Sequence, residues 1–129
     1  MRHKGRNSLV YLDIQIKARS KKSKLKHAGR FSSLEIDSER HPRPNYLFIF
    51  FSEHISDGTY WIFPASEIIE KGTSHGEKHK GKYNLSLAGM RKGSPYPKLE
   101  FEDYRDEKGF ELLESILDKL DANHQGMGL

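Results

Sequence analysis

The sequence predicts an α/β protein with a mixed four- to five-stranded sheet and flanking helices. Short apolar or alternating segments, typical of strands, recur between residues 8 and 88. A short helix is predicted between Pro64 and Gly72, and residues 106–120 have an amphipathic helical pattern. Strands that come first, with helices between and after them, indicate a sheet covered by helices on its faces.

The first predicted strand runs from Ser8 to Ala18 and has two different faces. One face is polar toward its end, with Asp13, Gln15 and Lys17, as expected where a strand opens on solvent or a cleft. The other face is uniformly apolar and is expected to contact the core. It consists of Val10, Leu12, Ile14, Ile16 and Ala18.

The strongest strand signal covers Asn45–Ser52, which is apolar on both faces and predicts the centre of the sheet. Asp57 and Gly58 predict a turn into a second strand, Thr59–Phe63, so the two form a hairpin. Residues 31–36 are compatible with a short strand or a helical turn, and residues 82–88 predict a further strand. The Gly- and Pro-rich residues 89–98 predict a basic loop.

The composition fits one domain over residues 1–129, with flexible ends at 1–7 and 123–129. The chain has no cysteine, which excludes disulfides and thiolate zinc sites and suits a reducing cytoplasm, the predicted location. The longest apolar run, residues 46–51, has the length of a strand and is far too short to span a bilayer. No membrane partner is therefore expected.

Charge is distributed unevenly along the chain. Residues 1–98 contain 19 basic and 9 acidic residues, a net of +10, whereas residues 99–129 contain 3 basic and 9 acidic residues, a net of −6. Such segregation predicts a body that faces a polyanion and an acidic C-terminal segment.

Asp13, Gln15 and Lys17 are candidate catalytic residues because they share one face of a strand. The Asp13 carboxylate and the Gln15 amide oxygen are the type of ligand that Mg²⁺ prefers, and the Lys17 ammonium can stabilise charge that develops on phosphorus. On spacing alone, a solvated strand face is the more common explanation of the same residues.

Five segments carry a resemblance that covers roughly residues 9–113. They are the strand Asp13–Lys17, the strand at 44–50, the strand-to-helix step at 60–66, the loop-to-strand step at 78–83, and Glu102-Asp103-Tyr104 before the last helix. In the order and spacing of these segments, the chain resembles prokaryotic nuclease-like domains of the restriction-endonuclease-like, or PD-(D/E)xK, superfamily. In that comparison Gln15 replaces the usual acid of the core strand, a variant that some members use.

The resemblance implies Mg²⁺-dependent cleavage of DNA, with Gln15 and Lys17 at the site. The superfamily has another acid on the preceding strand, after an N-terminal helix, but none of the first twelve residues is acidic. We therefore expect a domain shortened at its N-terminus. Asp13 is one replacement for the absent acid, Glu35 or Asp37 is another, and a second copy that completes the sheet is a third route, so a homodimer is plausible.

Two basic segments are predicted to contact nucleic-acid phosphates, and both are expected to leave strands of one sheet. The competing explanation is a pair of solvated loops. The candidate residues of the first segment are Arg19, Lys21, Lys22, Lys24, Lys26 and Arg30, and those of the second are Lys78, Lys80 and Lys82.

Three functions remain open from the sequence. The first is a Mg²⁺-dependent deoxyribonuclease that uses Asp13, Gln15 and Lys17. The second is a nuclease-fold protein that binds DNA without cleaving it. The third is a small basic interaction module without chemistry.

Overall fold

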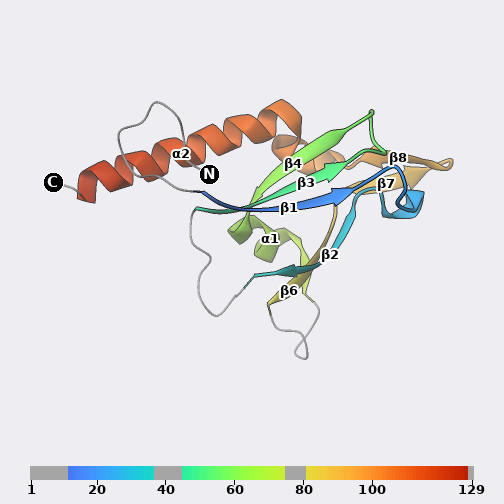
Figure 1. Cartoon of the computed structure of the whole chain (residues 1–129), viewed down its shortest axis with the longest axis horizontal. Helices are drawn as coiled ribbons and strands as arrows, with labels where there is room; N and C mark the ends of the chain where they lie inside the picture. Colours follow the sequence, from blue (N-terminus) through green and yellow to red (C-terminus); the bar gives the residue numbers. More distant parts are fainter. Residues whose placement is uncertain (1–11, 37–44, 75–80, 128–129) are drawn as a thin grey trace.

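The computed structural model describes residues 12–36, 45–74 and 81–127 (Figure 1). Within them the chain forms a mixed α/β structure with two three-stranded sheets and one two-stranded hairpin. The predicted α/β class is confirmed, but the single four- to five-stranded sheet is wrong.

The first sheet has the strand order β1-β3-β4 and contains the strongest strand of the sequence at its centre. β1 (Asp13–Arg19) runs parallel to β3 (Tyr46–Ser52), and β3 forms the predicted antiparallel hairpin with β4 (Thr59–Pro64). Ser56 and Asp57 adopt positive φ angles of 51° and 58° in the connecting turn. Because β3 has a parallel neighbour in β1 and an antiparallel neighbour in β4, the sheet is mixed, as predicted.

Helices contact opposite faces of this sheet (Figure 1). α1 (Ala65–Lys71) begins directly after Pro64 and ends before Gly72, as the sequence predicts. α2 (Asp106–Met127) continues beyond the predicted end at residue 120. Its Leu113 and Leu117 form one apolar cluster with residues of all three strands of the first sheet, namely Leu12, Leu47 and Ile62 together with the partly buried Ile14 and Ile49.

The second sheet has the order β2-β6-β5 and lies against the other face of the first (Figure 1). Its strands are β2 (Arg30–Glu35), β6 (Lys82–Ser86) and β5 (Thr73–Ser74), and both pairings are antiparallel. Aromatic side chains fill the space between the two sheets: the ring centroids of Phe31 and Phe50 are 4.7 Å apart. This cluster is the main core of the protein.

The outer edge of β4 is occupied by a segment from later in the chain. Trp61 of β4 pairs with Arg105 in an isolated antiparallel bridge, so the chain around η3 (Leu99–Tyr104) covers that edge. β2 and β6 pair with each other instead and form a second layer. Alternation of apolar residues predicts strands, but it does not state which edges those strands pair along.

Residues 88–97 form a hairpin where the sequence predicts a loop. β7 (Ala88–Arg91) pairs with β8 (Ser94–Pro97) across a two-residue turn. Lys92 and Gly93 both have positive φ, 50° and 78°, which is the geometry of the tight turns that suit the twist of a hairpin. The prolines of β8 are compatible with this strand because it lies at the edge of a two-stranded ribbon.

The apolar face of β1 is buried only at its beginning. Leu12 is buried, but Ile16 is 69% exposed and Ala18 is also exposed, so the prediction that both contact the core is wrong. β1 is at the edge of the strand order, and α2 packs chiefly on β4. The period of two identifies which residues share a face, but it does not show whether that face is covered.

Gly109 of α2 is expected to resist replacement by alanine, although alanine favours helices by about 1 kcal/mol. A Cβ atom at this position would lie 2.5 Å from the Tyr104 carbonyl oxygen and 3.4 Å from the Ile62 side chain. Because the oxygen belongs to backbone, Gly109→Ala should lower the free energy of unfolding by roughly 1–3 kcal/mol. Urea denaturation measures the change, and a gain in stability would show that helix propensity decides at this position.

No helix in the described part of the chain is both long enough and apolar enough to cross a membrane.

Candidate functional site

β1 brings the predicted catalytic residues onto one strand face, as the sequence indicates. Asp13, Gln15 and Lys17 alternate along it, and their register partners on β3 are Tyr46, Phe48 and Phe50. Gln15 and Lys17 are exposed, and Asp13 is partly buried at the start of the strand.

The donors around Asp13 are suited to Mg²⁺ in type, but they are few. The described residues contain no group of three His, Cys, Asp or Glu side chains arranged for a metal. Glu35, one predicted replacement acid, lies 3.9 Å from the Lys82 ammonium. Asp37, the other, lies outside the described residues. Mg²⁺ often uses only one or two carboxylates and completes its shell with water and substrate phosphate, so Asp13 and Gln15 alone are a minimal ligand set.

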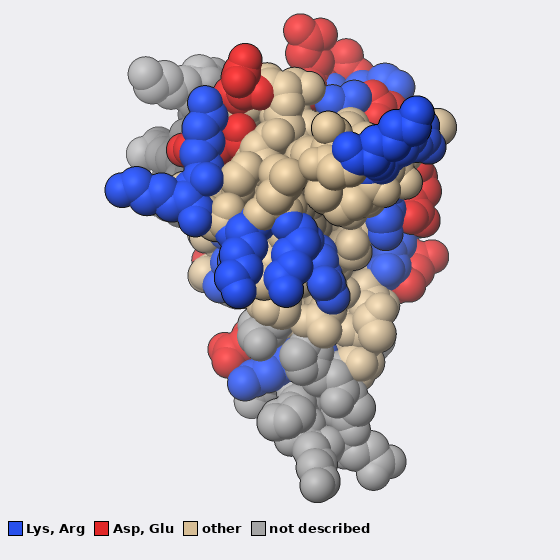
Figure 2. All heavy atoms as spheres, turned by 90° about the vertical axis from the view of Figure 1, so that its right-hand side faces the viewer, with Lys and Arg blue, Asp and Glu red and all other residues tan. Residues whose placement is uncertain are grey.

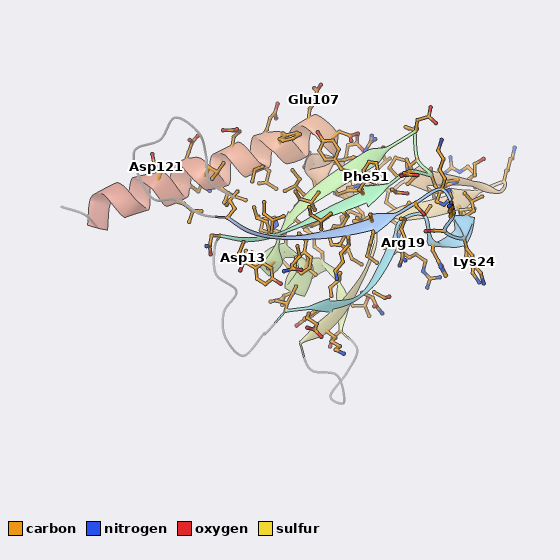
Figure 3. The ribbon with its side chains drawn as sticks, in the orientation of Figure 1. Asp13, Arg19, Lys24, Phe51, Glu107 and Asp121 are labelled. Atoms are coloured by element: carbon orange, nitrogen blue, oxygen red, sulfur yellow. The ribbon has the colours of Figure 1, made fainter. Side chains whose placement is uncertain are left out.

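The first basic segment is held to the end of the sheet by its backbone (Figure 3). The Lys21 backbone N–H donates to the Glu53 carboxylate at 3.0 Å, and the Glu53 backbone N–H donates to the Arg19 carbonyl at 2.9 Å. The His54 ring Nε2 lies 2.9 Å from the Ser23 carbonyl oxygen. These contacts fix the loop between β1 and η1 (Leu25–His27), so its exposed lysines project from an ordered frame.

Arg19 connects the two sheets at this end. Its Nε and Nη2 donate to the Arg30 carbonyl oxygen at 3.0 and 2.8 Å, and its guanidinium carbon lies 5.5 Å from the centre of the Phe31 ring. A guanidinium held in this way is already oriented and loses little freedom when it binds an anion. Figure 3 shows Arg19 and Asp13 at opposite ends of β1.

The β7–β8 hairpin adds cations that the sequence analysis did not include. The Leu87 backbone N–H donates to the Gly29 carbonyl at 2.7 Å, and β8 contacts η1. Gly29 is required here, because an added Cβ would lie 2.4 Å from that of Ala88. The contacts bring Arg91, Lys92 and Lys98 to the end of the molecule that carries the first basic segment.

These nine cations form a surface that we call the basic end. Figure 2 looks onto this side of the molecule and shows blue Lys and Arg side chains around a neutral centre, with most red Asp and Glu side chains toward the margins. Residues 14–34 and 78–99 contain no acid, which is the sequence signal that identifies both segments. The basic end consists of Arg19, Lys21, Lys22, Lys24, Lys26, Arg30, Arg91, Lys92 and Lys98.

The electrostatics of the basic end are visible at His27. Partial burial lowers the pKa of this imidazole, and the neighbouring cations Lys26, Arg19, Arg30 and Lys24 lower it further. A histidine among four cations stays neutral near pH 7, so it offers a neutral ring rather than a further charge.

Tyr96, an exposed aromatic in the basic hairpin, has a ring that is already in contact with a cation. The Arg91 guanidinium carbon lies 4.8 Å from the ring centre, and Gly89 allows the close approach of the Tyr96 hydroxyl. The pair offers a planar cation over an aromatic face, a combination that suits phosphates and stacked bases.

Lys82, the described residue of the second predicted basic segment, does not join the first segment. Lys78 and Lys80 lie outside the described residues. Lys82 begins β6, which belongs to the second sheet, and it pairs in register with Glu35 whereas Arg30 pairs with Ser86. Lys82 is therefore about five residues, roughly 16 Å, along β2 from the basic end. The prediction that both segments leave one sheet is wrong, because β1 and β6 belong to different layers.

No protein-family model, curated protein or solved structure matches this chain.

Proposed function

We propose that this protein binds the phosphate backbone of DNA through the basic end, on a domain of restriction-endonuclease-like fold. The observation that carries the proposal is the convergence of nine Lys and Arg side chains from residues 19–30 and 91–98 on one end of the molecule. Contacts of this kind neutralise phosphates, release counterions and do not depend on base sequence.

The arrangement of the first sheet supports the proposed fold. β1, which corresponds to the core strand of the resemblance, is parallel to β3, and β3 is antiparallel to β4. Helices contact the two faces of this mixed sheet, as the resemblance implies.

Equilibrium binding to duplex DNA at several salt concentrations tests the proposed function. If about six of the nine cations contact phosphates, the logarithm of the association constant should fall with the logarithm of salt with a slope near −5. Two duplexes of unrelated sequence should bind with similar affinity. A slope near zero, or a large preference for one duplex, would reject backbone binding as the basis of recognition.

Metal-dependent hydrolysis of DNA is the second candidate function, because Asp13, Gln15, Lys17 and Arg19 alternate along one strand. A DNA backbone that is bound at Arg19 can therefore extend along the strand toward Lys17. Mg²⁺ at Asp13 and Gln15 would supply Lewis-acid polarisation of a phosphoryl oxygen. The chain itself contributes the Lys17 ammonium, which stabilises negative charge on phosphorus.

Lys17→Ala is expected to reduce any chelator-sensitive cleavage of DNA by about 100-fold or more. Lys17 is exposed, so the free energy of unfolding should change by less than about 0.5 kcal/mol. Supercoiled, linear and single-stranded DNA with Mg²⁺ or Mn²⁺ are suitable substrates, and Lys119→Ala on α2 is the matched control. Cleavage by Lys17→Ala at the rate of the unchanged protein would remove β1 as the catalytic element.

A further inference from the structure

A pocket of about 410 Å³ lies beside the basic end, on the β2-β6-β5 sheet. Its volume is within the range of sites that hold small molecules. Its lining combines two arginines and a histidine with neutral polar side chains. The lining residues are Arg19, His27, Arg30, Phe31, Ser32, Thr73, Asn84, Leu85 and Ser86.

The alternation of the second sheet explains why this pocket is polar. Phe31 of β2 and Leu85 of β6 are buried in the main core. The residues next to them along each strand therefore lie on the opposite face of the second sheet. On β2 this face carries Arg30 and Ser32, and on β6 it carries Asn84 and Ser86. Thr73 of β5 extends the polar row, because it pairs in register with Asn84.

The cationic end of the pocket is preorganised by Arg19. Two of its nitrogens, Nε and Nη2, donate to the Arg30 carbonyl, so the guanidinium is held in place where it lines the pocket. Arg30 is exposed and carries the second guanidinium. His27, whose pKa the surrounding cations help to lower, adds a ring that can donate or accept a hydrogen bond.

The lining indicates what kind of ligand it recognises. Among the residues that the structure describes, no acidic side chain lines the pocket, and the two guanidinium groups at one end suit an anion that accepts several hydrogen bonds. A phosphate monoester has a charge of about −1.5 to −2 near pH 7, more than the single charge of a backbone diester. The hydroxyls of Ser32, Thr73 and Ser86 offer partners for a sugar or a base.

We propose that this pocket binds a nucleotide by its terminal phosphate monoester, with the phosphate at Arg19 and Arg30 and the nucleoside over the polar row of β6 and β5. The inference rests on the proposed function, since the pocket adjoins the surface assigned to the DNA backbone. The same chemistry has two sources, the phosphorylated end of a DNA strand and a free mononucleotide.

The test compares single-stranded oligonucleotides of one sequence that have a 5′-phosphate, a 3′-phosphate or hydroxyls at both ends. At least one phosphorylated strand should bind about tenfold more tightly than the hydroxyl strand, the factor that one hydrogen bond to a charged group supplies. Arg30→Gln should abolish this ratio. Lys26→Gln removes the same charge from a residue outside the pocket, so it should weaken all three strands alike and keep the ratio.

Free adenosine monophosphate and inorganic phosphate separate the two sources. Amide chemical shifts of Ser32 and Asn84 that change with the mononucleotide, and change less in Arg30→Gln, would support the inference even where the three strands bind equally. Equal binding of all strands without such shifts would overturn it, and so would inorganic phosphate that binds as tightly as the mononucleotide. If the inference fails in either of these ways but duplex affinity still falls steeply with salt, the proposal of backbone binding stands. If the mononucleotide binds and DNA does not, only the proposed function is rejected.

Discussion

Replacement of Lys22 and Lys24 by glutamine is expected to weaken DNA binding on the order of 100-fold at about 50 mM salt. Both side chains are exposed on the loop that Glu53 and His54 hold against the sheet. Each lysine that contacts a phosphate releases about one counterion, so the salt slope should become shallower by about 2. Fluorescence anisotropy with a labelled duplex measures both quantities.

The matched control replaces Lys108 and Lys119 of α2, which removes the same charge from the acidic C-terminal segment. Lys108 is paired with Asp103 at 3.6 Å on the surface, and such pairs contribute little to stability. The control should change the salt slope by far less than the loop variant. Equal effects of the two variants would mean that net charge, and not the basic end, determines binding.

Phe63→Ala is expected to lower the free energy of unfolding by about 3–5 kcal/mol. Phe63 is fully buried, and its ring centre lies 4.1 Å from that of Tyr104 and 5.7 Å from that of Phe101. Its removal leaves a cavity between β4 and the η3 segment that covers the edge of the sheet. Chemical denaturation measures the loss.

Phe110→Ala is the matched control for this core substitution. Phe110 is 52% exposed and contacts the Tyr60 ring edge-on at 5.4 Å, so its removal should cost about 1 kcal/mol. The sequence pattern alone places Phe110 in the same apolar stripe as Leu113 and Leu117 and does not separate its burial from theirs. Similar losses for Phe63→Ala and Phe110→Ala would contradict the described core.

The sequence predicts best those elements for which the apolar pattern agrees with the residues at turns and helix ends. β3 and β4 combine apolar runs with a turn at Asp57 and Gly58, and α1 has Pro64 before it and Gly72 after it. Local sequence determines such elements, and the structure confirms them. The β7–β8 hairpin was missed because its strands contain prolines and glycine and have no apolar alternation, while its turn depends on the positive φ of Lys92 and Gly93.

The arrangement of sheets depended on contacts between distant segments, which the sequence pattern does not contain. The bridge between Trp61 and Arg105 closes one edge of the first sheet, and nothing local to β4 predicts it. Ile16 has the same alternation as Leu12, yet only Leu12 is buried, because coverage by another element determines burial. The homodimer stays a prediction.

The sequence predicts that the candidate site is rich in Lys and Arg, but it does not predict all of the residues that form it. The six cations of residues 19–30 lie together, Lys82 lies elsewhere, and residues 91–98 supply Arg91, Lys92 and Lys98. The acid-free residues 78–99 contain these three cations, so the signal was present in the sequence. The contacts of Leu87 with Gly29 and of β8 with η1 show that the hairpin adjoins the first basic segment.

The most direct test of the central claim is a titration of the isotope-labelled chain with a short DNA duplex, followed by amide chemical shifts. The basic end predicts that the shifts concentrate in residues 19–30 and 88–98 and vanish when salt is raised. Shifts confined to α2, or no shifts at low salt, would contradict the assignment of this surface to DNA.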